Sequence, residues 1–195
     1  MTCTSVAFKE WAILVERFGR GEQILILRKG GIHEKRGGFE VEHRGFFLFP
    51  TLFHQQLEGV VPEARVPLDL LATAGANPKE VKLEFWAEVT DAHWITDEAA
   101  LDRLRPFHAW TREVVRERFE YGTEPGIFAL VVRVFRVAGP KTFALKPEHG
   151  GCRSWLELKS EETPSLERKK PALSDLDFES RRAAIAAALP MAAAR

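Results

Sequence analysis

The apolar side chains of this chain recur at two spacings, one typical of helices and one typical of strands. The first helix-spaced set consists of Phe8, Trp11, Ala12, Val15 and Phe18. Their separation by three or four residues predicts one helix with a single buried face. By contrast, Val81 to Val89 alternates apolar and polar residues, which predicts a strand with one buried face. Ile127 to Val137 is apolar on both faces in its first half, so we expect a strand inside a sheet.

Shorter elements complete the expected order. Brief apolar runs predict strands at residues 24–27, 46–49 and 155–158. Asp97 is placed to cap a short helix through Leu104, and a second helix is expected from Pro106 to about Phe119, with Trp110 in the core. Short strands mixed with helices and Gly/Pro turns favour an α+β fold, a small mixed β-barrel with helices packed outside.

The composition changes after Ser160, where the chain becomes first charged and then rich in alanine. We therefore expect a globular domain over residues 1–159 and a mobile tail over residues 160–195. Asp177 to Leu189 is compatible with a helix inside that tail. One hypothesis makes the tail a docking segment for a protein partner, in a module without enzymatic activity.

Composition excludes several classes of protein. The 195 residues carry 28 Lys+Arg and 28 Asp+Glu, so a globally basic packager of nucleic acid is excluded. Only Cys3 and Cys152 are present, which fits a reducing cytoplasm. We expect a cytoplasmic protein without a signal peptide, since no apolar run approaches the roughly 20 residues of a membrane-spanning helix. The phosphate-loop, paired Cys-x-x-Cys and Gly-x-Ser-x-Gly patterns are missing.

The neutral total hides an uneven distribution of charge. Arg28 to Arg44 holds five Lys/Arg against three acids, and Arg133 to Lys159 holds six against two. Lys82 to Glu124 is acidic, with ten acids against six cations. If the two basic segments meet in space, they form a positive face; otherwise they are ordinary solvated surface.

Several residues of the basic segments suit nucleic-acid recognition. The glycine-rich run from Arg28 to Gly38 lets a backbone approach a ligand closely, although it also suits a plain loop. Histidine and glutamine can read base edges, arginine and lysine bind phosphates, and Trp155 can stack on a base. The candidate binding residues are Arg28, Lys29, His33, Lys35, Arg36, His43, Arg44, His54, Gln55, Arg153 and Trp155.

A magnesium-dependent nuclease of the restriction type is the enzymatic alternative. Glu148 and Glu157 would hold the metal, and Lys159 would position the attacking water. No other cofactor is expected. His149 and Cys152 have the spacing of zinc ligands, but no second pair is near, so we predict no metal site. His108 either faces a groove or caps a helix.

Five strings together resemble one family. They are Phe8-Lys9-Glu10-Trp11-Ala12, Leu27-Arg28-Lys29-Gly30-Gly31-Ile32, Phe46 to Thr51 with His54-Gln55, Phe107-His108-Ala109-Trp110-Thr111, and Gly151-Cys152-Arg153-Ser154-Trp155. The chain resembles the prokaryotic family called domain of unknown function 1802, from about Phe8 to Leu158. Relatives fused to a restriction endonuclease domain of the Mrr type imply restriction-modification biology, although no such domain is evident in this chain.

The order of elements is also similar to that of the ASCH and EVE domains of the PUA-like barrel superfamily. The shared features are a helix before the strand that ends in Arg28, and a strand from Gly151 to Leu158 after Pro140. This resemblance implies a barrel that binds RNA or modified DNA in a basic groove, with Arg28 and Lys29 at the groove. The sequence therefore favours a nucleic-acid-binding module without catalytic residues, acting in restriction-modification or in surveillance of RNA modification.

Overall fold

The computed structural model describes residues 5–29, 43–52, 57–65, 79–151 and 153–189, and the backbone of residues 34–35 and 38–39. Its main sheet has the order β2-β7-β6-β5-β1-β8, and β9 pairs with the outer part of β7. The strands are β1 (Val6–Trp11), β2 (Leu25–Arg28), β5 (Gly45–Thr51), β6 (Glu80–Ile95), β7 (Ile127–Ala144), β8 (Trp155–Glu157) and β9 (Lys170–Pro171). β1 and β5 are parallel, whereas the other neighbours are antiparallel.

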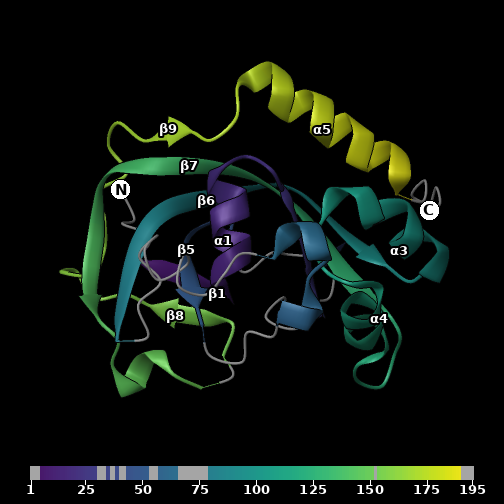
Figure 1. Cartoon of the computed structure of the whole chain (residues 1–195), viewed down its shortest axis with the longest axis horizontal. Helices are drawn as coiled ribbons and strands as arrows, with labels where there is room; N and C mark the ends of the chain where they lie inside the picture. Colours follow the sequence, from purple (N-terminus) through teal and green to yellow (C-terminus); the bar gives the residue numbers. More distant parts are fainter. Residues whose placement is uncertain are drawn as a thin grey trace.

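The sheet curls into a half-barrel because its two longest strands bend together. β6 and β7 pair over almost their whole length, with register shifts between Leu83 and Phe85 and between Val89 and Asp91. Such shifts increase the local twist of a strand pair. In Figure 1 the two strands sweep around helix α1 (Ala12–Gly19). The prediction of an α+β fold with a curled mixed sheet is confirmed.

Both faces of the sheet are covered. Phe8 belongs to the larger core, with α1, whereas its neighbour Ala7 belongs to a second core on the opposite face. α1 is buried nearly all round, and a Cβ built on Gly19 would lie 2.1 Å from the Phe85 ring. A larger residue at Gly19 would therefore push α1 away from β6.

The helix predicted from Phe8 to Phe18 is wrong in its first third. Residues Val6–Trp11 form β1, and the helix begins only at Ala12. β1 pairs with both β5 and β8, and its residues are buried on both faces, so they show no alternation. Phe8 and Trp11 match the helical spacing only because they stand three residues apart next to a real helix.

The helices outside the sheet follow the prediction with one change. α3 (Glu98–Leu104) begins at Asp97, whose carboxylate accepts a hydrogen bond from Ala99 N at 3.0 Å. The helix expected from Pro106 is divided into a 3-10 turn, η3 (Arg105–Phe107), and α4 (Arg112–Glu120). The break follows from other partners of the backbone: Ala109 N donates to Gln23 Oε1, and Trp110 bridges to Val60. Within the described ranges, no helix has both the length and the hydropathy needed to cross a membrane.

Residues 160–189, which we call the C-terminal clasp, pack on the body of the protein. They include β9 and helix α5 (Asp175–Ala188), which lies along the top of Figure 1. Phe178 and Ile185 of α5 are buried in the larger core. The expected helix is thus present, and the clasp covers the fold in place of the separate tail that the composition suggested. Phe178 and Ile185 are therefore not available on the surface for a protein partner to bind.

Candidate nucleic-acid interface

The described part of the predicted binding set gathers where the two ends of the curled sheet, β2 and β8, approach each other. We call it the basic rim, and it consists of Arg28, Lys29, His43, Arg44, Arg153 and Trp155. His33, Arg36, His54 and Gln55 lie outside the described residues. Of Lys35 only the backbone is described, in a separate two-stranded pair of β3 (Glu34–Lys35) with β4 (Gly38–Phe39).

Arg28 joins the two basic segments at this rim. From the end of β2 its Nη1 donates to the Lys9 carbonyl at 3.1 Å, and its Nη2 donates to Ser154 Oγ at 3.2 Å. The guanidinium carbon lies 4.8 Å from the centroid of the Phe8 ring. β2 and β8 are at opposite ends of the sheet order, so Arg28 bridges the gap of the half-barrel with side-chain bonds.

A glycine turn carries Arg153 to the rim. Lys9 Nζ donates to the carbonyls of Gly150 and Gly151 at 2.9 and 3.1 Å. Gly151 has a φ of +78°, a conformation that favours glycine. Arg153 then stands exposed, and its side chain makes no hydrogen bond or ion pair with the described residues. The fixed turn therefore presents a cation that is available to a ligand.

Trp155 is held by aromatic contacts on its inner side. Its ring centroid lies 4.8 Å from that of Phe8 and 5.1 Å from that of Phe46. His43 packs edge-on against the same ring at 4.9 Å. Trp155 keeps partial exposure, so a fixed aromatic surface lies between the two basic segments.

Lys29 of the rim and the neighbouring Arg118 extend the positive charge toward α4. Lys29 Nζ donates to the carbonyls of Phe119 and Glu124. Arg118 Nη1 donates to the Leu27 carbonyl at 3.0 Å, and its guanidinium lies 3.8 Å from the Trp110 ring centroid. Burial lowers the pKa of Arg118 from its ordinary value, yet an arginine remains charged.

One buried carboxylate faces these cations. Glu10 lies at the end of β1, where its Oε1 accepts from Trp11 N at 2.9 Å and its Oε2 lies 3.9 Å from Arg28 Nη1. Glu10 and Glu117 are the acids that favour the charged form of Arg118. Arg28, Lys29 and Arg118 otherwise bind neutral acceptors, which leaves the edge positive.

The second basic segment is mostly neutralised, by three acids from outside it and by its own Glu148. Four of its six cations form ion pairs, so the local excess of positive charge in the sequence does not describe the surface. The pairs are Arg133 with Asp175, Arg136 with Glu84, Lys146 with Glu162, and Lys159 with Glu148. Lys141 and Arg153 make no ion pair within the described residues. Only the end of this segment therefore adds to the rim.

The residues of the nuclease alternative do not form one cluster. Lys159 Nζ and Glu148 Oε1 are 2.7 Å apart and exposed, and their contact lowers the pKa of Glu148 and raises that of Lys159. In the described part of the chain, Glu157 on β8 makes no hydrogen bond or ion pair with either of them. Among all residues that the structure describes, no three His, Cys, Asp or Glu side chains are placed to hold a metal ion. The structure thus does not bring together the two carboxylates and the lysine that the nuclease alternative uses.

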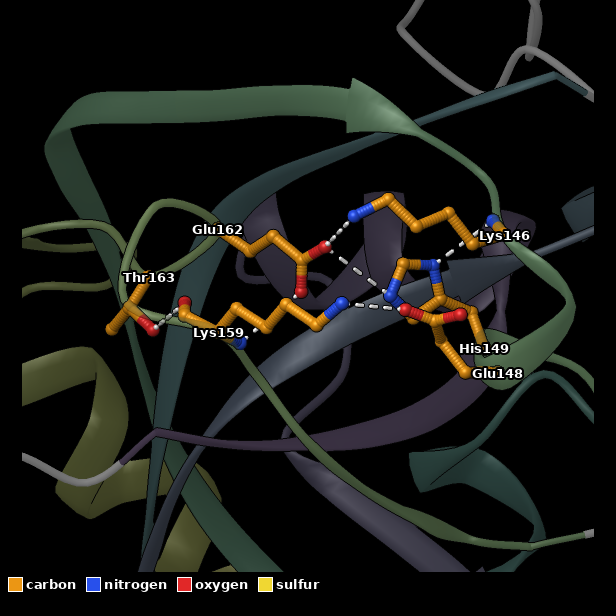
Figure 2. A network of polar contacts seen from close by, with 6 residues as sticks. All are labelled: Lys146, Glu148, His149, Lys159, Glu162 and Thr163. Carbon is orange, nitrogen blue, oxygen red and sulfur yellow. Dashed lines mark hydrogen bonds and ion pairs between the residues drawn. The ribbon is translucent and has the colours of Figure 1, made fainter.

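Figure 2 shows what these residues build instead. Glu162 is buried and accepts from Lys146 Nζ at 2.9 Å and from Lys159 N at 3.1 Å. His149 Nδ1 accepts from Lys146 N, so the ring hydrogen is on Nε2, which lies 3.4 Å from Glu162 Oε1. Burial alone would raise the pKa of Glu162, but the Lys146 and Lys159 hydrogen bonds and the charges of His149 and Lys146 lower it. This network ties the start of the clasp to the turn after β7.

Sequence reasoning missed Lys9, Glu10, Arg118 and Ser154. A helix starting at Phe8 would leave Lys9 on its polar side, whereas Lys9 and Glu10 are both buried in β1. Two adjacent charged residues between apolar ones are the signal that could have marked them, since buried charges need partners. Arg118 gave no signal, because its partner Leu27 O is 91 residues away.

The fold and the rim together define a mixed α+β protein whose half-barrel sheet carries a positively charged edge. The chain belongs to the family described as Domain of unknown function (DUF1802), whose model matches residues 7–184. The family prediction is confirmed, and the match continues beyond Leu158 into α5.

Solved structures similar to this chain include ASCH from Zymomonas mobilis. It is 12% identical, has a TM-score of 0.45 and covers 82% of this chain and 90% of its own. A mutant ZmASCH protein from the same organism is 10% identical, has a TM-score of 0.46 and covers 82% and 92%. At these identities the likeness concerns the fold alone. No curated protein matches the chain.

Proposed function

We propose that this protein is a nucleic-acid-binding module whose basic rim holds the phosphate backbone. The observation that carries the proposal is the kind of partner each rim cation has. Arg28 and Lys29 donate to backbone carbonyls and a hydroxyl, with one carboxylate, that of Glu10, 3.9 Å from Arg28. Arg44 and Arg153 have no ion-pair partner among the described residues. Cations fixed by neutral acceptors keep their charge for an anionic ligand.

The residues divide into two roles. Arg44 and Arg153 are exposed and would contact phosphates, while Arg28 and Lys29 supply charge from fixed positions. Trp155, with His43 against it, would stack on a base. His33, Lys35, Arg36, His54 and Gln55 stay predictions for phosphate and base contacts. We further propose that such a module acts in restriction-modification or in surveillance of RNA modification.

Fluorescence anisotropy with single- and double-stranded RNA and DNA, measured across salt concentrations, tests this proposal. The logarithm of the association constant is expected to fall linearly with the logarithm of the salt concentration, because phosphate contacts release counterions. Arg153→Ala should weaken binding, whereas Lys141→Ala, an exposed cation of the same segment, should not. No salt-sensitive binding to any of the four nucleic acids would refute the proposal.

A further inference from the structure

A small cavity opens between α3 and α4, and residues of both helices and of the segment between them line it. Its volume is about 20 Å³. A site needs about 10–15 Å³ to admit one water-sized group, so a single ligand atom or small polar group fits inside. Leu101 and Val115 contribute apolar wall, while the remaining lining side chains are charged or polar.

His108 lines this cavity and lacks a hydrogen-bond partner. Its side chain is 9% exposed, and neither Nδ1 nor Nε2 makes a hydrogen bond within the described residues. Burial, then the charges of Arg105 and Arg118, lower its pKa to about 4, while the nearby Trp110 backbone acts weakly in the opposite direction. The ring is therefore neutral at pH 7, with one donor and one acceptor unused. A buried polar group without a partner costs free energy, which a ligand at this position would recover.

The charges around the ring favour an anion. Arg112 pairs with Asp102 at 2.8 Å, and Arg116 lies 3.6 Å from Glu98, so these two cations are largely neutralised. Arg105 lines the same cavity, and its side chain makes no ion pair with the described residues. The charges that act on His108 are those of Arg105 and Arg118, both positive.

We propose that this cavity binds a phosphate group, with the neutral His108 ring donating one hydrogen bond and Arg105 supplying the positive charge. One phosphate oxygen would enter the cavity toward His108, and the others would stay at its mouth near the Arg105 guanidinium. A tetrahedral anion can reach both donors at once, and arginine binds phosphate through two parallel hydrogen bonds. The phosphate is either free or the end of a nucleic acid, and only the second case rests on the proposed function.

Calorimetric titration of inorganic phosphate into the full chain tests the site itself. Arg105→Ala should lower the affinity by roughly tenfold or more, because it removes the unpaired charge. His108→Phe removes the ring N–H, so it should abolish phosphate binding. The phenyl ring has a similar shape, so the melting temperature should stay equal or rise. Arg20→Ala, an exposed arginine outside the cavity, is the matched control. No binding by the wild-type chain, or unchanged binding by Arg105→Ala, would overturn the proposal.

A second arm identifies the source of the phosphate. The affinity is measured for three forms of one oligonucleotide: one with a 5′-phosphate, one with a 3′-phosphate and one with hydroxyl groups at both ends. The wild-type chain should prefer one of the phosphorylated forms. If Arg105→Ala removes this preference and leaves the affinity for the hydroxyl-ended form unchanged, the ligand of the cavity is a terminal phosphate of a nucleic acid. Equal affinity for all three ends overturns that source and leaves a site for free phosphate. If no oligonucleotide binds, the proposed function fails, and the titration with inorganic phosphate still decides whether the site exists.

Discussion

The basic rim and the C-terminal clasp are both rich in cations, but they use them in opposite ways. At the rim, Arg28 and Lys29 donate to neutral oxygens. Across the clasp, cations bind carboxylates: Arg133 with Asp175, Lys169 with Glu88 and Arg182 with Asp91. The first arrangement preserves positive potential at a surface, whereas the second cancels it while joining two segments. The number of cations does not distinguish a binding surface from a clasp. The atom that each cation contacts does, because a carboxylate cancels the positive charge and a carbonyl does not.

The largest expected effect comes from removing the anchor of the clasp. Phe178 is 2% exposed, and the Arg133 guanidinium lies 4.9 Å from its ring centroid. Phe178→Ala should lower the free energy of unfolding by about 3–5 kcal/mol, as expected for a buried aromatic ring. Urea denaturation measures this, with the exposed Leu176→Ala in the same helix as control. A variant as stable as the wild type would show that the clasp contributes no packing and is a tail after all.

The second-largest expected effect comes from reversing the charge of the rim. It should lower the affinity for nucleic acid and leave the stability of the fold unchanged. Arg44→Glu combined with Arg153→Glu should weaken nucleic-acid binding by roughly 10- to 100-fold and reduce the salt slope by about two units. Both side chains are exposed and make no ion pair within the described residues, so the melting temperature should stay constant. Lys141→Glu is the control for charge reversal elsewhere. Equal losses per reversed charge in the control and in the double variant would mean that only total charge matters.

The network of Figure 2 allows a test with pH. Glu162 is 1% exposed, and Glu162→Gln should lower the free energy of unfolding at pH 7 by about 1–3 kcal/mol, since Lys146 would lose its anionic partner and one of the two acceptor oxygens would become a donor. The pKa of Glu162 is lowered in the folded state. Its contribution is therefore complete above its unfolded pKa of about 4.5 and is lost as pH falls through the folded value.

Thermal melting from pH 7 down to the acid range measures this linkage. The wild-type and Glu162→Gln curves should converge below about pH 4.5. Glu148→Gln, which alters the exposed acid of the same network, should run parallel to the wild type. A constant difference between wild type and Glu162→Gln at every pH would contradict the linkage.

These regions also show how far local pattern carries a prediction. The alternation from Val81 to Val89 predicts β6 correctly, and Asp97 predicts the start of α3, because the cause lies within a few residues. The same reasoning fails at Lys9 and Glu10, where strand pairing with β5 and β8 overrides helical spacing.

Distant pairing explains what the sequence could not predict about the site. Arg28 and Trp155 were predicted as binding residues, but their meeting depends on Ser154, 126 residues from Arg28. The clasp escaped prediction because Phe178 and Ile185 are its few buried apolar residues in an alanine-rich helix. Its ion pairs were invisible as well, since Arg182 and Asp91 are 91 residues apart. Charge sums over a window of sequence therefore cannot assign a surface potential.

The smallest expected effect is the loss of one clasp ion pair. Arg182 donates to both carboxylate oxygens of Asp91, at 2.6 and 2.9 Å, and this contact lowers the pKa of Asp91. Both side chains are partly exposed, so Arg182→Ala should lower the free energy of unfolding by only about 0.5–1 kcal/mol, and less at high salt. Nucleic-acid affinity should not change, because that charge is already cancelled by Asp91. A loss of affinity in Arg182→Ala matching that of Arg153→Ala would instead mean that rim and clasp form one binding surface, and the distinction between carbonyl-bound and carboxylate-bound cations would fail.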